Sequence, residues 1–311
     1  MSEHRTAPAI DPDLVEWPGS TVAVGSRSLY VRRAGSSGAA PAVFVHGLGG
    51  SSTNWTDLMA LLSAHVDGHA LDLPGFGRSP APVDGRYDLD AHVAAVAGYI
   101  EEVGLAPVHL FGNSLGGAVT TRLASERPDL VRTLTLVSPA LPSLRPVKGG
   151  DPTLGMLLVP GLSNVVRRRL ERTSPEERLQ TLLEIVFADP TRIPAHRLAQ
   201  ATAEIRRRQS LPWTTSALVG SLRGIVRAYL DRSSRGLWQQ AARVPVPTLL
   251  VYGKQDRIVS FTTAARAAAS FPDNRLLELD DVGHVAQMEV PSVVAEAVLR
   301  LIADVERSMS A

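Results

Sequence analysis

Hydrophobic and polar positions follow two patterns that alternate along the chain. Short runs rich in apolar and β-branched residues are apolar at nearly every position, which is typical of strands covered on both faces. The runs predict a hairpin that turns at Gly25-Ser26, followed by six further strands. The predicted strands are 22–24, 29–32, 42–46, 68–73, 108–112, 133–138, 248–252 and 275–279.

Between several of these runs the apolar residues recur every three or four positions, as they do on the buried face of a helix. Residues 89–103 and 115–127 are two such stretches. Strands that alternate with helices predict an α/β fold, with a mostly parallel central sheet flanked by helices.

One connection departs from this alternation. Between Ser138 and Thr248 the chain has no strand pattern, but it has three helical patterns, at 174–187, 194–209 and 215–230. The first begins with Ser-Pro-Glu-Glu, an N-cap serine followed by proline and a capping-box glutamate. Open α/β sheets bind ligands at the carboxyl ends of their strands, so we expect a helical cap at that edge. The expected organisation is a core from residues 1–140, a helical cap from 141–243 and the rest of the core from 244–311.

Composition narrows the function classes. The chain has 311 residues, 44% of them apolar and 20% charged, and a net charge of +1. This near balance gives no field that would attract nucleic acid or an anionic membrane. The absence of cysteine excludes a disulfide framework, a thiolate metal site and a cysteine nucleophile. No apolar run has the length of a signal peptide or a membrane span, so we expect a cytoplasmic protein without integral membrane association.

A nucleophile is indicated where the strand at 108–112 meets the next helix. The segment Gly112-Asn113-Ser114-Leu115-Gly116 has the G-x-S-x-G spacing of a nucleophile elbow. In such an elbow the serine adopts a strained conformation, and its neighbours must lack bulk. The alternative is a plain glycine-rich turn in which the serine only caps the helix.

Partners for a nucleophilic serine occur further along the chain, and they favour the elbow. A serine hydroxyl needs a base, and the base needs an acid that orients it. Asp256 follows the strand at 248–252 and His284 follows the strand at 275–279, so both are expected at the sheet edge that carries Ser114. Asp280 and Asp281 are rival acids, but residues so close to the histidine usually turn away from it.

Acyl transfer also requires donors for a developing oxyanion. The elbow supplies the backbone N–H of Leu115, at the start of a helix. The turn that begins at His46 and continues through Gly47-Leu48-Gly49-Gly50 is expected to supply the N–H of Leu48 as the second donor. His46 is interpreted as a structural anchor and not as a base.

Five motifs, in order and spacing, resemble the α/β-hydrolase fold superfamily, in the branch with a helical cap after the sixth strand. They are AVFVHGLGG, LDLPGFGRS, FGNSLGG, VYGKQDRIV and DDVGHVAQME. The resemblance implies a serine hydrolase with the triad Ser114, Asp256 and His284, the oxyanion donors Leu48 and Leu115, and a structural role for residues 73–79. It implies no metal and no organic cofactor.

The broadest function that fits is hydrolysis of a small-molecule carboxylic ester through an acyl-enzyme. The alternative is a hydrolase that cleaves carbon–carbon bonds of meta-ring-fission dienoates, since Asn113-Ser114 resembles the G-N-S-x-G-G of those enzymes. Val285 departs from their usual tryptophan, and HGLGGSST lacks their Gly-Pro-Gly run. A catalytically silent binding protein is a third possibility, which the complete set of triad candidates disfavours.

The cap has no recognisable motif. Its apolar residues either line an acyl pocket or form core: Met156, Leu157, Leu158, Val159, Leu162, Leu182, Ile185, Val186, Phe187, Trp213 and Trp238. The runs 167–169 and 206–208 are all arginine and are predicted as solvated helix ends. A further hypothesis has one of these arginines reach the site to hold a substrate carboxylate.

Overall fold

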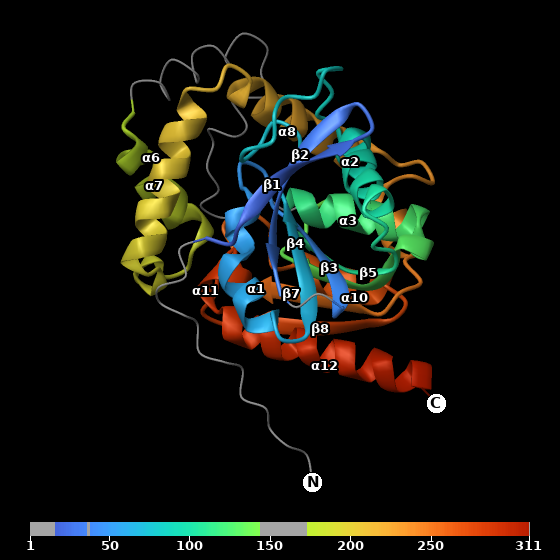
Figure 1. Ribbon diagram of the computed structural model, residues 1–311. Coiled ribbons are helices and arrows are strands. Elements are labelled where there is room, and N and C mark those ends of the chain that lie inside the picture. Colours follow the sequence, from blue (N-terminus) through green and yellow to red (C-terminus); the bar gives the residue numbers. More distant parts are fainter. Residues whose placement is uncertain (1–15, 36–37, 144–172, 311) are drawn as a thin grey trace.

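The computed structural model describes residues 16–35, 38–143 and 173–310 (Figure 1). Two predictions for the cap therefore lie outside the described residues. They concern the apolar residues 156–159 and 162, expected to line an acyl pocket or form core, and the arginine run 167–169.

Eight strands form one sheet in the order β1-β2-β4-β3-β5-β6-β7-β8. The pairs β1–β2 and β2–β4 are antiparallel, and β4, β3, β5, β6, β7 and β8 run parallel. The predicted α/β class is confirmed, and each predicted strand overlaps an observed one. The strands are β1 Gly19–Val24, β2 Arg27–Ala34, β3 Ala40–Val45, β4 Val66–Leu71, β5 Val108–Asn113, β6 Val131–Val137, β7 Thr248–Gly253 and β8 Asn274–Leu279.

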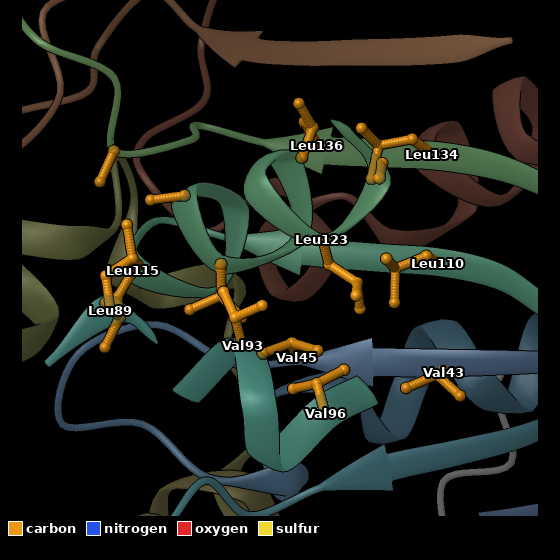
Figure 2. Close-up of a cluster of buried hydrophobic side chains, with 14 of the residues drawn as sticks. Val43, Val45, Leu89, Val93, Val96, Leu110, Leu115, Leu123, Leu134 and Leu136 are labelled. Carbon is orange, nitrogen blue, oxygen red and sulfur yellow. The ribbon is translucent and has the colours of Figure 1, made fainter. Parts of the chain in front are cut away.

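Helices cover both faces of the sheet, which explains why the strands are apolar at successive positions. Val43 and Val45 of β3 point into one core with α2 (Leu89–Glu102) and α3 (Leu115–Glu126), as Figure 2 shows. Ala42 and Phe44 of the same strand point into the opposite core, with α1 (Thr56–Leu62), α11 (Ala286–Glu289) and α12 (Pro291–Ser310). The remaining elements of the core are α10 Thr263–Ser270 and the short helices η1 Ser52–Trp55 and η2 Pro128–Leu130.

The described part of the connection between β6 and β7 is helical. Its elements are α6 Pro175–Val186, η3 Pro190–Arg192, α7 Ala195–Gln209, α8 Thr214–Leu230 and α9 Leu237–Ala241. We call residues 173–243 the helical insertion. The capping box at the start of α6 is present, because Ser174 Oγ accepts from Glu177 N–H and the Glu177 side chain accepts from Ser174 N–H. In Figure 1, α6 and α7 lie together to one side of the sheet.

The prediction that residues 206–208 form a solvated helix end is wrong for two of the three arginines. The Arg206 side chain is 64% exposed, but those of Arg207 and Arg208 are 29% and 18% exposed. The reason is that α7 ends against loops of the core, where Arg207 donates to Gly77 O and Arg208 donates to Gly49 O.

The apolar residues of α6 divide between core and surface. Leu179, Leu183 and Phe187 are buried in a small cluster with Ile205 and Val285, whereas Leu182 is 43% exposed. Phe187 is therefore a core residue of the helical insertion.

Candidate active site

Ser114 lies between the last residue of β5 and the first residue of α3. Its backbone has φ +53° and ψ −115°, a conformation that non-glycine residues rarely adopt. Hydrogen bonds hold the turn, because Ser114 N–H donates to Val137 O at 3.1 Å and Ser114 O accepts from the N–H of Ala140 at 2.9 Å. The side chain lies at the carboxyl end of the parallel strands.

The two glycines of the predicted elbow have no room for a side chain. A Cβ on Gly112 would lie 2.5 Å from Gly116 O, and one on Gly116 would lie 2.7 Å from His46 O and closer still to Val45 O. The spacing of the motif therefore reflects the close approach of α3 to strands β3 and β5.

Asp256 and His284 meet although they come from different loops. Asp256 Oδ2 lies 2.8 Å from His284 Nδ1, and Asp256 Oδ1 accepts from the N–H groups of Ile258 (2.7 Å) and Val259 (2.9 Å). Burial acts to raise the pKa of Asp256, but the imidazole and these hydrogen bonds outweigh it and hold the pKa below its ordinary value. The carboxylate is thus kept charged and aimed at the histidine.

The rival acids are engaged or exposed elsewhere. Asp280 pairs with Lys254 Nζ at 2.5 Å, and its side chain is 79% exposed. Asp281 is exposed, and its main-chain oxygen accepts from Arg192 at 2.7 Å.

Asn113 joins the serine turn to the histidine loop. Its Nδ2 donates to Val137 O at 3.0 Å and to His284 O at 3.2 Å. Ser114 and His284 are 8% and 4% exposed. The residue before the serine, whose role the sequence did not reveal, therefore fixes the histidine backbone next to the predicted nucleophile.

The loop after β3 lies directly against Ser114. A Cβ built on Gly47 would be 3.1 Å from Ser114 Cβ and 3.0 Å from Asn113 Oδ1, so a larger residue would require the serine turn to shift by a few tenths of an ångström. We call residues 47–50 the Gly47–Gly50 loop. This contact places the loop that carries Leu48 beside Ser114, and Leu115 follows Ser114 as the first residue of α3.

His46 controls the orientation of the Gly47–Leu48 peptide. Leu73 N–H donates to His46 Nε2 at 3.0 Å, so the proton must be on Nδ1, which donates to Gly47 O at 2.7 Å. Gly50 N–H donates to the same oxygen at 3.0 Å. Because a trans peptide directs its C=O and N–H oppositely, fixing Gly47 O on one side aims Leu48 N–H to the other.

Burial lowers the pKa of His46, which favours the neutral ring that this hydrogen-bond pattern requires. The other buried histidines are also engaged away from Ser114. His69 Nδ1 lies 2.7 Å from Tyr99 Oη, His92 Nε2 lies 2.8 Å from Ser221 Oγ, and His109 Nδ1 lies 2.9 Å from Thr133 Oγ1.

Arg208 lies at the loop beside Ser114, although the sequence predicts residues 206–208 first as a solvated helix end and only second as a source of an arginine that reaches the site. From α7 its Nη1 donates to Gly49 O and lies 3.5 Å from Gly50 O, and its Nε lies 3.5 Å from Glu204. Burial lowers the pKa of Arg208, while the charge of Glu204 opposes that effect. The sequence did not indicate which arginine would reach the core or that it would bond a main-chain oxygen, since these contacts depend on where α7 ends.

Within the described ranges, no group of three or more histidine or acidic side chains comes together in a way that could hold a metal ion. In the same part of the chain, every helix is too short or too polar to cross a bilayer.

Comparison with known proteins identifies the family of this fold. Residues 41–291 match the family model described as alpha/beta hydrolase fold. A putative lipase from Acinetobacter baumannii, of known crystal structure, superposes with a TM-score of 0.76 at 21% identity, covering 95% of this chain and 94% of that one.

Curated relatives fall into different activity classes. The dihydrolipoyllysine-residue acetyltransferase component of an acetoin cleaving system from Cupriavidus necator is 31% identical over 85% of this chain. The chain spans only 63% of that relative's length. A 2-hydroxy-6-oxononadienedioate/2-hydroxy-6-oxononatrienedioate hydrolase from a Pseudomonas species is 27% identical over 89% of this chain and 92% of the relative. Lipase 3 of a Moraxella species is 25% identical over 86% of this chain and 79% of the lipase.

Proposed function

Because the chain belongs to the α/β-hydrolase fold family, we propose that it is a serine hydrolase that cleaves small carboxylic esters through an acyl-enzyme. The observation that carries the proposal is the pairing of His284 Nδ1 with Asp256 Oδ2 at 2.8 Å, beside a serine with φ +53°. A serine needs an oriented base to attack an acyl carbon at neutral pH, and the paired imidazole supplies that base.

In the proposed reaction, His284 Nε2 takes the proton of Ser114 Oγ as the oxygen attacks the ester carbonyl. The charged imidazole is stabilised by Asp256, which keeps Nδ1 protonated and the ring oriented. His284 then returns the proton to the leaving alcohol. Water, activated by the same histidine, releases the acid and restores Ser114.

The backbone N–H groups of Leu48 and Leu115 are the proposed donors to the tetrahedral oxyanion. Leu115 N–H lies at the start of α3, where the helix dipole also favours negative charge. Leu48 N–H is aimed by the bonds to Gly47 O described above. Removing one such donor typically costs about 10²- to 10³-fold in rate.

We also propose that residues 141–243 act as a cap that shapes the substrate pocket. The contacts of Arg207 and Arg208 with core loops support this position. Both loops follow strands of the sheet, where open α/β folds bind ligands.

Carbon–carbon bond hydrolysis is the second candidate. It is supported by the resemblance to the Pseudomonas hydrolase over 92% of that relative, and by Asn113 before the serine. Against it, Arg208, which among the described residues of the insertion contacts the loop beside Ser114, is already engaged. Arg208 bonds Gly49 O and lies 3.5 Å from Glu204, so it is not free to hold a second carboxylate.

The test is hydrolysis of p-nitrophenyl esters from acetate to palmitate, with wild type beside Ser114→Ala. Turnover by wild type that is lost in the variant supports the ester hydrolase, and the preferred chain length reports the size of the acyl pocket. The same proteins are then given a coloured ring-fission dienoate. Turnover of the dienoate by folded wild type, without turnover of any ester, would establish the alternative.

A further inference from the structure

The buried carboxylate of Glu289 ties the helical insertion to the loop that carries His284. The side chain is fully buried, at 0% exposure. Oε2 accepts from Gly283 N–H at 2.8 Å and from Ala188 N–H at 3.2 Å, and Oε1 accepts from Asp189 N–H at 3.0 Å and from Arg192 Nη1 at 3.1 Å. One carboxylate therefore joins four donors from two segments about 100 residues apart in the chain.

The main chain of His284 is held from two sides. Its N–H donates to Val186 O, the last residue of α6, at 2.7 Å. Its C=O accepts from Asn113 Nδ2 at 3.2 Å. The imidazole thus projects from a peptide segment fixed between the helical insertion and the serine turn, and only the first of these two contacts depends on the insertion.

Gly283 allows the helical insertion to approach this closely. A Cβ on Gly283 would lie 2.6 Å from Val186 O and 2.7 Å from Ala188 N, which are backbone atoms that cannot swing aside. On the other side of the loop, a Cβ on Gly253, at the end of β7, would collide with Val282 O and Gly283 O. Residues 282–284 are therefore packed between two backbone segments.

Apolar contacts close the same junction. Val285, next to His284, is 7% exposed and belongs to the cluster that Leu179, Leu183 and Phe187 form within the insertion. Met288 packs against that cluster from α11. The Glu289 side chain and its bond to Gly283 N–H are buried in this junction, which makes that bond stronger than it would be in water and its loss more costly.

We propose that Glu289 is a positioning residue, which acts through this junction to hold His284 in register with Asp256 and Ser114. This inference rests on the proposed serine-hydrolase function. The carboxylate oxygens of Glu289 accept from Gly283, Ala188, Asp189 and Arg192, and not from Ser114, Asp256 or the His284 imidazole. Glu289 fixes residues 188–189 and Gly283, and thereby keeps Val186 O against the His284 N–H.

The test compares wild type with Glu289→Gln, which keeps the size of the side chain but replaces one acceptor oxygen by an NH₂ group that faces two N–H donors. The matched control is Glu296→Gln, on α12, because Glu296 is 61% exposed and pairs with the exposed Arg300 at 2.5 Å. Two properties are measured: kcat and KM for p-nitrophenyl acetate, and the low-field proton resonance of the His284 Nδ1–H bond to Asp256.

For Glu289→Gln we expect kcat to fall about 10- to 100-fold with KM within about twofold of wild type, since misplacement of a catalytic group mainly affects the chemical step. The low-field resonance should broaden or move, and Glu296→Gln should match wild type in both properties. Folded Glu289→Gln with wild-type kcat and an unchanged resonance would overturn the inference. So would a fall in activity with the resonance unchanged, because that result would indicate a general structural role.

Two further controls keep the outcome decisive. If Glu289→Gln does not fold, Arg192→Gln replaces it, since Arg192 is 34% exposed and its loss leaves the three backbone donors to Glu289 in place. Arg192→Gln should lower kcat by about threefold and should broaden or move the low-field resonance. Wild-type values of both would contradict the proposal. If folded wild type hydrolyses no ester, the proposed function fails, but the resonance still tests the position of His284 without any substrate.

Discussion

Arg208, on helix α7, donates a hydrogen bond to the main-chain oxygen of Gly49, in the loop that lies against Ser114. This contact joins the helical insertion to the Gly47–Gly50 loop, which carries the predicted oxyanion donor Leu48. A second contact of the insertion, through Glu289, reaches the loop that carries His284. The helical insertion therefore contacts both the Gly47–Gly50 loop and the loop that carries His284.

Arg208→Gln is expected to lower kcat for ester hydrolysis about tenfold. A hydrogen bond from a charged donor contributes about 1.5–3 kcal/mol, and its loss frees Gly49 O and loosens the Gly47–Gly50 loop. The measurement is steady-state kinetics beside Arg206→Gln, whose side chain is 64% exposed and should tolerate the change. Equal activity of the two variants would show that the loop holds its shape without Arg208.

Asp256→Asn is expected to reduce kcat by about 10⁴-fold while the protein stays folded, because the amide cannot hold Nδ1 protonated or stabilise a charged imidazole. Asp280→Asn is the control, since that side chain is 79% exposed and pairs with Lys254. A large loss in the control, with activity retained in Asp256→Asn, would reassign the acid.

Ser114→Gly is expected to be more stable than Ser114→Ala, with a free energy of unfolding about 1 kcal/mol higher. Both variants lose the hydroxyl, but only glycine relieves the strain of φ +53°, which is worth about 1–3 kcal/mol before the entropy of glycine in the unfolded chain is subtracted. Urea denaturation measures the difference.

The control pair is Ser63→Gly and Ser63→Ala, at a residue with φ −61°. There alanine should be the more stable of the two. The same order at both positions would argue that Ser114 is not strained.

His92 is expected to make the protein less stable as the pH falls. Burial lowers the pKa of His92 to about 3, so between about pH 6.5 and pH 3 the unfolded chain binds a proton that the folded protein does not. Stability is therefore highest above this window and decreases on acidification.

Between pH 7 and pH 5 the free energy of unfolding should fall for wild type by on the order of 2 kcal/mol more than it falls for His92→Gln. Urea titrations at the two pH values measure this, with His65→Gln as the control at a half-buried histidine. An unchanged slope for His92→Gln would mean that this imidazole is protonated in the folded protein.

The sequence alone determined the α/β fold, because strands buried on both faces must be apolar throughout, and this pattern differs from the helical one. The same local information located the helices of the insertion, where Ser174 and Glu177 cap the first of them. It also indicated Ser114, since Gly112 and Gly116 occur where no Cβ fits.

Only the tertiary structure decided which long-range partners meet. Asp256 and Asp280 are equally plausible acids by residue type, and the register of β7 beside β8 brings Asp256 to His284. The placement of Arg208 on the Gly47–Gly50 loop and of Glu289 at the histidine loop depends on how the insertion packs against the core. Side-chain roles of this kind depend on which distant segments of the chain come into contact. Local periodicity predicts secondary structure but does not predict those contacts.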